Sequence, residues 1–405
     1  MTSRQALIVY RDELLGASET FVLGQAESLS SFQPFYVGLR GRSGLSLPES
    51  RFHIVGRDGL IGKLQRARFK LLGPNPSLVS MLAEKRPALI HAHFGPDGCN
   101  AIALAHALRV PLVVTLHGYD VTVDDGHLPR LYIQRRSLLK SHAAKFICVS
   151  DFIRKQAIEK GFPVEKTLVH YTGVDLDTFH VRPMDSRSPA VLFVGRLVPK
   201  KGCEYLIRAM ARVQAVIPGA QLIVIGDGPL RSQLELQAAA ALNNYEFLGE
   251  QEPVTVRDWM NRATVLGAPS VVAESGDAEG FGMIFAEAQA MGLPVASFAS
   301  GGIPEAVADG QSGFLVPERD DQALAAKLVL LLGDRVLWTK MSEHGRARAI
   351  RLFNIRTQTA ILENIYESVL SEWNGKTHVQ TYSDRTVVIA QTIKSLCTFA
   401  QSRSL

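Results

Sequence analysis

The chain has 405 residues, 46% of them hydrophobic, which is enough for two globular domains of ordinary size. No apolar run reaches 18 residues, which excludes a protein built around membrane-spanning helices. The first residues, MTSRQALIVY, read as a strand and not as a signal peptide, so we expect a cytoplasmic protein. The cysteines show no paired spacing and predict neither a disulfide framework nor a metal site: Cys99, Cys148, Cys203 and Cys397.

The net charge of +5 is spread unevenly along the chain. Residues 1–180 hold 22 Lys and Arg against 16 Asp and Glu, whereas the remainder holds 22 against 23. A basic N-terminal half predicts an anionic partner, such as an anionic membrane surface or a lipid diphosphate. We expect no nucleic-acid partner, because no aromatic-rich basic module accompanies the charge.

Short apolar runs alternate with helical patterns along the chain, which predicts an α/β fold of parallel sheets and crossover helices. Valine, isoleucine, leucine and phenylalanine dominate these runs, as in strands covered on both faces. In the first half we expect strands at 6–10, 35–39, 88–93, 112–116, 145–149 and 167–171, with helices at 98–108 and 128–141. In the second half we expect strands at 191–194, 222–225, 245–248, 264–268, 294–297 and 313–316.

A polar segment without periodicity, VDLDTFHVRPMDSRSP at residues 174–189, separates the two halves and is typical of an interdomain linker. We therefore predict domains at 1–173 and 190–354. Helical patterns at 335–351 and 355–373 follow the last strand. The tail at 374–405 contains TVVIAQTIKSLCTF, residues 386–399, which is either a frayed terminus or an amphipathic helix that contacts a membrane.

Two carboxylates, Glu279 and Glu287, stand eight positions apart in AEGFGMIFAEAQAM, residues 278–291. A flexible Gly-Phe-Gly loop leads from the first into an apolar helical run, so we expect Glu279 in the loop and Glu287 on the helix. Free N–H groups at a helix N-terminus favour an anion or a sugar oxygen. We interpret the segment as two acceptors for the hydroxyl groups of one elongated ligand. The alternative is that both glutamates are ordinary surface residues.

Further motifs follow the expected strands of the second half. Gly195, Arg196 and Lys201 come after the strand at 191–194, GDG at 226–228 follows the next strand, and SGGIPE occupies 300–305. In this order, and with two glutamates separated by seven residues around EGFG, the motifs resemble the C-terminal half of retaining GT-B glycosyltransferases of family 4. The resemblance covers most of residues 191–332.

The resemblance implies the GT-B fold, in which two Rossmann-like parallel-sheet domains face each other across a cleft. A last helix, here 355–373, would cross back onto the N-terminal domain. The resemblance also implies that Arg196 and Lys201 grip the diphosphate of a sugar nucleotide, while Glu279 holds the sugar and Glu287 accepts from the ribose hydroxyls. Glycine turns and one aromatic residue would complete the donor site: Gly195, Gly226, Gly280, Phe281 and Gly282.

Histidines mark the ends of two neighbouring expected strands, in HAHFG at 91–95 and TLHGYD at 115–120. His91, His93 and His117 could bind zinc together, although structural roles are the alternative. The two segments resemble bacterial glycosyltransferases of exopolysaccharide and colanic-acid type. In these proteins the histidine of the second segment, here His117, lies close to the reacting sugar and the leaving phosphate. His93 and Asp120 are candidates on the acceptor side.

The sequence SETF at 18–21 also resembles this subgroup. It follows the first strand, where Gly16 and the start of a helix could approach a phosphate. The family often has two glycines in this loop, whereas this chain has one. Asp175 and Asp177 form a D-x-D pair of the kind that holds a divalent cation in GT-A glycosyltransferases, but their place in the linker favours a structural role.

These motifs predict retaining, metal-independent transfer of a hexose from a UDP- or GDP-sugar to an alcohol acceptor. We expect no cofactor and no metal, because Arg196 and Lys201 would supply the cations for the departing diphosphate. The resemblance favours a lipid-linked saccharide as acceptor, at the inner face of a bacterial membrane, in exopolysaccharide biosynthesis. A sugar-nucleotide 2-epimerase and a non-catalytic sugar-nucleotide-binding protein are alternatives on the same fold.

Overall fold

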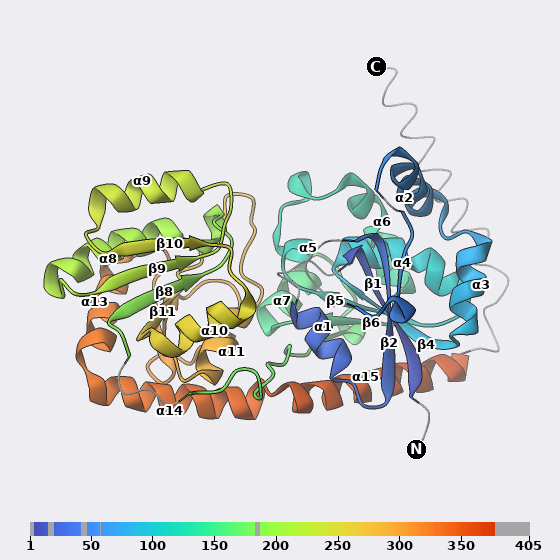
Figure 1. Ribbon diagram of the computed structural model, residues 1–405. Helices are drawn as coiled ribbons and strands as arrows, with labels where there is room; N and C mark the ends of the chain where they lie inside the picture. Colours follow the sequence, from blue (N-terminus) through green and yellow to red (C-terminus); the bar gives the residue numbers. More distant parts are fainter. Residues whose placement is uncertain (1–3, 15–19, 42–46, 57, 183–186, 377–405) are drawn as a thin grey trace.

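The computed structural model describes residues 4–14, 20–41, 47–56, 58–182 and 187–376. Each half of the chain forms a parallel sheet, and the halves stand side by side as two α/β domains (Figure 1). The N-terminal sheet has the order β3-β2-β1-β4-β5-β6-β7, and the C-terminal sheet has the order β10-β9-β8-β11-β12-β13. In both sheets the strand order reverses beside the first strand, as in Rossmann-like domains. The predicted fold class is confirmed.

The N-terminal sheet consists of β1 (Gln5–Leu14), β2 (Phe32–Gly41), β3 (Phe52–Ile54), β4 (Pro87–His93), β5 (Leu112–Leu116), β6 (Lys145–Cys148) and β7 (Thr167–Val169). The C-terminal sheet consists of β8 (Ala190–Val194), β9 (Gln221–Ile225), β10 (Tyr245–Gly249), β11 (Val265–Gly267), β12 (Val295–Phe298) and β13 (Gly313–Val316). All of these except β3 were expected from the sequence.

The helices of the N-terminal domain are α1 (Thr20–Glu27), α2 (Leu60–Leu72), α3 (Pro76–Glu84), α4 (Gly95–Leu108), α5 (Tyr119–Thr122), α6 (Arg130–His142) and α7 (Asp151–Glu159). The C-terminal domain has α8 (Cys203–Val216), α9 (Arg231–Ala241), α10 (Pro253–Arg262), α11 (Met283–Ala290), α12 (Ile303–Ala306), α13 (Asp321–Gly333) and α14 (Arg335–Leu352). The last described helix is α15 (Ile355–Lys376).

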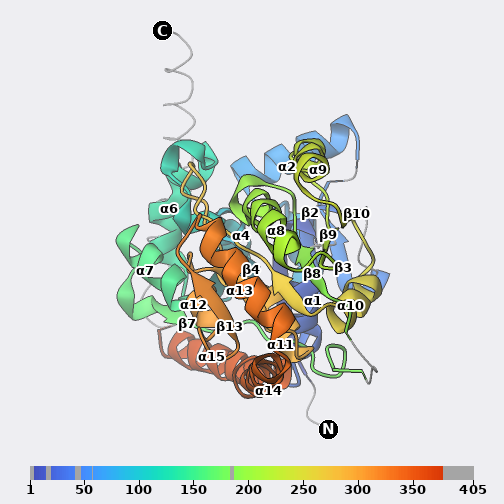
Figure 2. The same cartoon turned by 90° about the vertical axis from the view of Figure 1, so that its left-hand side faces the viewer.

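Helices cover both faces of each sheet because the strands are apolar on both faces. In the C-terminal domain, Val191 and Val224 pack with α8 and α13, whereas Leu192 and Ile223 pack with α10 and α11. Figure 2 looks onto this domain, with α8 and α13 in front of the sheet. The sandwich leaves the carboxyl ends of the strands, where the predicted motifs lie, for a ligand.

The last helices join the two domains. In Figure 1, α14 runs along the C-terminal domain and α15 continues along the N-terminal domain. The Glu363 carboxylate on α15 accepts hydrogen bonds from the N–H groups of Ser30 (2.7 Å) and Ser31 (2.6 Å), and the Tyr366 hydroxyl lies 2.6 Å from Nδ1 of His91. Among the described residues, no helix is both long enough and apolar enough to span a bilayer. The predicted amphipathic segment 386–399 lies outside them.

Candidate active site

The two domains meet at the carboxyl ends of their strands, and the loop before α11 forms the centre of the contact. The Ser150 hydroxyl donates a hydrogen bond to the carbonyl oxygen of Gly280 at 2.6 Å. A Cβ atom on Gly280 would overlap the carbonyl oxygen of His117, and one on Gly302 would overlap the carbonyl oxygen of Gly280. Three backbone segments are therefore stacked with no space for side chains, which fixes the residue before Gly280, Glu279, relative to His117.

A carboxylate of the C-terminal domain caps a helix of the N-terminal domain. Glu305 accepts hydrogen bonds from the backbone N–H groups of Asp151 (2.7 Å) and Phe152 (2.8 Å), the first residues of α7. The Tyr171 hydroxyl donates to the same carboxylate at 3.3 Å. Negative charge is favourable at a helix N-terminus. The SGGIPE motif thus supplies an interdomain contact that the sequence alone did not reveal.

Lys201 and Glu279 form an ion pair at the mouth of the C-terminal sheet, and Lys200 pairs with Asp277 at 3.0 Å beside it. Burial disfavours the charged form of Glu279, but Lys201, Lys200 and a hydrogen bond from Ser270 outweigh it and hold the pKa of Glu279 below its ordinary value. The carboxylate is therefore ionised at neutral pH. It lies in the loop that precedes α11, as predicted.

Arg196 is exposed, and no described residue forms an ion pair or hydrogen bond with its side chain. It follows Gly195 in the loop after β8. Gly226 has a φ of 132°, and a Cβ atom there would overlap the carbonyl oxygen of Gly195. Contact between two protein loops is thus the reason for glycine at position 226. The predicted place of Gly226 in the donor site stays a prediction.

Glu287 projects from α11, and no described residue hydrogen-bonds to its carboxylate. Burial raises its pKa to about 7, and the charge of Arg257 offsets only part of this effect. Nε of Arg257 is buried without a hydrogen-bond partner among the described residues. This carboxylate therefore has free acceptor capacity, which ligand hydroxyl groups could use. Nothing in the sequence marked Arg257.

The side chain of Phe281 packs away from solvent. It is 3% exposed, and its ring lies 5.4 Å from the ring of Tyr171 and 5.2 Å from that of Phe353. The expectation that Phe281 contacts the donor does not fit this burial. Its side chain anchors the loop instead. Gly282, with a φ of 79°, ends the loop where α11 begins, because a side chain there would overlap the ring of Phe285.

The three histidines cluster at the ends of β4 and β5. Nδ1 of His93 lies 3.1 Å from Nε2 of His117, and Nε2 of His91 lies 2.7 Å from the Thr115 hydroxyl. Burial lowers the pKa values of His93 and His117 well below the ordinary value, and the positive charge of Arg11 lowers them further. Burial lowers the pKa of His91 to about 3, so all three are neutral at pH 7. Arg11, which the sequence did not single out, also donates a hydrogen bond to the His93 carbonyl oxygen at 3.2 Å.

Asp120 is fully buried, and its carboxylate accepts hydrogen bonds from three backbone N–H groups. The donors are Gly95 (2.9 Å), Gly118 (2.9 Å) and His117 (3.2 Å). The expectation that Asp120 contacts an acceptor is therefore wrong for this arrangement, because the side chain has no exposed surface. Asp120 is a positioning residue that ties the end of β5 to the start of α4.

The remaining predicted residues lie in the linker or outside the ranges that the structure describes. Gly16 is not among the described residues, although Phe21 of the same motif lies on α1 with its ring 5.3 Å from that of His117. Asp175 accepts a hydrogen bond from the N–H of Asp177 at 3.0 Å, as in a turn. Within the described ranges, no group of three or more His, Cys, Asp or Glu residues is arranged to hold a metal ion.

Comparisons with known proteins agree with this architecture. Residues 177–348 match the family described as glycosyl transferases group 1, and residues 27–178 match glycosyltransferase family 4. The chain is 35% identical over 316 residues to the GDP-mannose-dependent monoacylated alpha-(1-6)-phosphatidylinositol monomannoside mannosyltransferase of Corynebacterium glutamicum. That match covers 73% of this chain and 81% of the relative. The chain belongs to the group 1 glycosyltransferases, and it is a glycosyltransferase.

A second relative in sequence and a solved structure are also similar to this chain. The putative colanic acid biosynthesis glycosyltransferase of Salmonella typhimurium is 32% identical over 245 residues, which are 58% of this chain and 59% of that protein. The chain thus spans about three-fifths of the length of that relative. The Anabaena protein HepE, solved in complex with UDP-glucose, has a TM-score of 0.74 at 21% identity, covering 90% of this chain and all of that one. This likeness shows the shared fold.

The stacked backbone at Gly280 leads to a first prediction. Gly280→Ala should abolish glycosyl transfer, because its Cβ would push the loop and Glu279 away from His117. We expect kcat/KM to fall by at least about 10², the usual cost of a misplaced catalytic group. Gly219→Ala is the matched control, because a Cβ there meets no atom within 4 Å. A Gly280→Ala enzyme as active as this control would show that the contact is not needed.

The raised pKa of Glu287 leads to a second prediction. If ligand hydroxyl groups donate to its carboxylate, nucleotide affinity should be full above pH 7 and decline as the pH falls through about 7. Between pH 8 and pH 6 the ionised fraction of such a group falls about tenfold, and the affinity should follow. Calorimetry with UDP and GDP measures it.

Glu287→Gln is the control for this titration. It should remove the contribution of Glu287 while keeping the one from the nucleotide phosphates, which titrate in both proteins. If the pH profiles of the variant and the wild type are parallel, Glu287 does not bind the nucleotide as a carboxylate.

Proposed function

We propose that this glycosyltransferase transfers a hexose from a nucleoside-diphosphate sugar to a lipid-linked saccharide, with retention and without a metal ion. One observation carries the proposal. The ion pair of Lys201 and Glu279 and the exposed guanidinium of Arg196 lie at the carboxyl ends of one sheet, and the Gly280 contact brings them to His117 on the other. Phosphate-binding cations and a sugar-binding carboxylate thus face the domain that would hold the acceptor.

The cations act on the leaving group. As the anomeric bond breaks, the sugar gains oxocarbenium character and negative charge builds on the diphosphate. Arg196 offers a planar fork of donors and Lys201 a point charge, both of which suit phosphate oxygens. The ion pair with Glu279 already holds Lys201 in place before the donor arrives, so little reorganisation is needed.

The histidines can act as neutral hydrogen-bonding groups. Because His93 and His117 are hydrogen-bonded to each other, each restrains the ring orientation of the other. A neutral imidazole at position 117 can donate or accept a hydrogen bond at the reacting sugar without adding a charge there. Arg11 favours this neutral form by opposing protonation of both rings.

Retention follows if the acceptor attacks from the face that the diphosphate leaves. The carboxylates near the reaction centre are engaged, Glu279 with Lys201 and Asp120 with three backbone N–H groups. The proposal therefore assigns neither of them as a nucleophile. In the proposed reaction the departing phosphate oxygen accepts the proton of the attacking hydroxyl group, so no separate base is required.

The names of the relatives guide the choice of substrates. The Corynebacterium relative is named for GDP-mannose and a phosphatidylinositol mannoside, and the Salmonella relative for colanic acid biosynthesis. The structural neighbour was solved with UDP-glucose. We therefore propose a UDP- or GDP-hexose as donor and a lipid-linked saccharide as acceptor. The enzyme would work at the cytoplasmic face of a membrane, in polysaccharide or glycolipid synthesis.

A third prediction tests the diphosphate contacts and the absence of a metal. With the donor identified by thermal stabilisation in a panel of UDP- and GDP-sugars, turnover should persist in excess EDTA.

Arg196→Ala and Lys201→Ala should each lower kcat/KM by about 10²–10³, the usual cost of one preorganised contact. Arg208→Ala, on the exposed face of α8 with Glu204 as its partner, is the control and should keep full activity. Loss of activity in EDTA with rescue by Mn²⁺ would contradict the proposal, as would a tenth or more of wild-type kcat/KM in either variant.

A fourth prediction separates the two glutamates. Glu287→Gln should weaken binding of the free nucleotide and of the sugar nucleotide equally, because the ribose is remote from the reacting carbon. Glu279→Gln should spare the free nucleotide and lower kcat, because the position and charge of the sugar change in the transition state. Each lost charge-assisted hydrogen bond corresponds to about 1.5–3 kcal/mol.

Calorimetry and steady-state kinetics on the two variants distinguish the roles. The opposite pattern, in which Glu279→Gln loses nucleotide affinity and Glu287→Gln does not, would mean that the assignments are reversed. Unchanged binding and rate in both variants would make both glutamates ordinary surface residues.

A further inference from the structure

Helix α2 turns an apolar face to solvent. It packs on the domain through Phe69, which is 3% exposed, and through Gly62. At about 100° per residue, its exposed large apolar side chains fall within an arc of roughly 120° on the opposite side. They are between 38% and 74% exposed: Leu60, Ile61, Leu64, Leu71 and Leu72. We call these five residues the α2 apolar face.

Basic residues accompany this face, and the helix contains no acidic residue. Arg66 donates to the carbonyl oxygen of Gly56 at 3.0 Å, and Lys70 pairs with Asp12 at 2.5 Å. Lys63 and Arg68 are exposed and have no ion-pair partner among the described residues. At the same helical spacing Arg68 falls inside the apolar arc and Lys63 falls beside it. The face therefore combines apolar surface with uncompensated positive charge.

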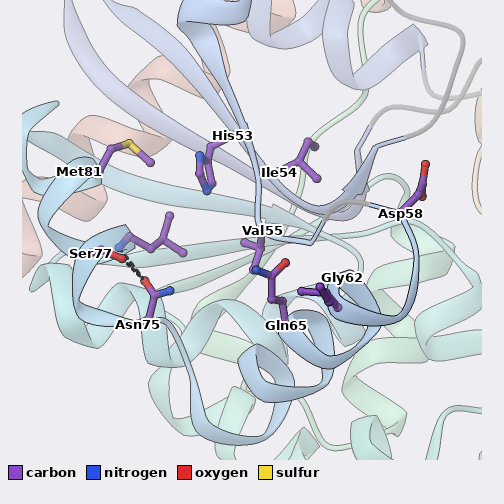
Figure 3. Close-up of a pocket in the computed structure, with 11 residues that line it drawn as sticks. His53, Ile54, Val55, Asp58, Gly62, Gln65, Asn75, Ser77 and Met81 are labelled. Carbon is purple, nitrogen blue, oxygen red and sulfur yellow. Dashed lines mark hydrogen bonds between the residues drawn. The ribbon is translucent and has the colours of Figure 1, made fainter.

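A cavity adjoins the α2 apolar face. Its volume is 660 Å³, and it lies between α2, β3 and α3 (Figure 3). Ile61 and Gln65 reach it from α2, and Ile54, Val55 and Met81 line it from the other elements. His53, Asp58, Asn75 and Ser77 add polar groups to its wall, and the last two are joined by a hydrogen bond of 2.9 Å. The mixed lining of this cavity sets it apart from the apolar face itself.

We propose that the α2 apolar face docks onto an anionic lipid surface. An exposed helix with an apolar stripe and unpaired Lys and Arg residues has the chemistry of an interfacial helix, which inserts its apolar side chains while its cations meet lipid phosphates. Other strongly exposed apolar residues, such as Leu236 on α9 and Val336 on α14, are single and form no comparable stripe. The α2 apolar face is therefore the surface that best fits anionic lipid, because its stripe lies beside the positive charges of Lys63 and Arg68.

The position of α2 connects the docking surface to the reaction. The helix follows the carboxyl end of β3, and the carboxyl ends of parallel strands share one edge of a sheet. That edge also carries His93 and His117 at the ends of β4 and β5. Docking through α2 would hold the acceptor side of the cleft next to the lipid surface. This link to a lipid-linked acceptor rests on the proposed function, whereas lipid binding itself does not.

Vesicle binding of the full-length protein tests the proposal. Co-sedimentation should be strong with vesicles that contain phosphatidylglycerol and weak with phosphatidylcholine alone, and salt should reduce it. Leu64→Glu combined with Leu71→Glu should lower the partition coefficient at least about tenfold, because two inserted apolar groups become charged. Lys63→Glu combined with Arg68→Glu should do the same. Leu236→Glu, 73% exposed in the wild type, is the matched control and should bind normally.

Further measurements separate the other outcomes. Thermal unfolding and nucleotide affinity without vesicles should be equal in all variants, so failure of docking and failure of the donor site are distinguishable. The proposal would be overturned if the wild-type protein did not co-sediment with anionic vesicles, or if an α2 variant bound them as well as the wild type. Loss of binding on removal of residues 377–405 alone would also overturn it. If light scattering shows a wild-type dimer that the α2 variants convert to monomer, without any vesicle binding, a second copy covers the face instead.

Discussion

The proposed site depends on the contact of bare backbone between the two domains. Gly280 lies between His117 on one side and Gly302 on the other, and the Ser150 hydroxyl bonds its carbonyl oxygen at 2.6 Å. Because no side chain fits in this stack, the distance between the two sheets at this point is set by backbone atoms, which vary little with sequence. Glu279 directly precedes Gly280 in the chain, so the stack also fixes the backbone position from which the Glu279 side chain extends. A donor held by one domain then meets groups of the other without a flexible intermediary.

The two glutamates of the motif have identical side chains but opposite pKa shifts, because their surroundings differ. Glu279 is surrounded by Lys201, Lys200 and a hydroxyl group, which keep it ionised, whereas burial with only Arg257 nearby raises the pKa of Glu287 to about 7. Glu279 is thus a permanent charge at the position where the proposed function requires the sugar. Glu287 is a carboxylate whose burial a ligand with two hydroxyl groups would compensate. The spacing of eight residues places one on the loop and the other on α11.

The sequence predicted most of the fold because the buried strands are apolar on both faces, and twelve of the thirteen strands were expected. The exception, β3, has three partly buried residues at the edge of its sheet, too few to show a pattern. The charges of the proposed donor site, Lys201 and Glu279, could be found from their motifs. The role of Asp120 could not, because a carboxylate after a strand reads the same whether it faces solvent or backbone N–H groups. Contacts such as that of Glu305 with α7 join residues about 150 positions apart, and no local pattern encodes them.

The contact made by Glu305 adds a charged group to the same interface. Besides the Gly280 stack, the described residues join the domains through packing of Phe281 on Tyr171 and through hydrogen bonds. These bonds include Asp124 N–H to the Ser275 carbonyl oxygen at 2.9 Å and the two bonds from α7 to Glu305. A hydrogen bond to a charged group contributes about 1.5–3 kcal/mol, so the Glu305 pair is worth only a few kcal/mol. That is comparable with the stabilisation that a ligand at 100 times its Kd provides, about 2.7 kcal/mol. The Glu305 contact is therefore similar in size to the stabilisation from a bound ligand, and α15 links the two domains independently of it.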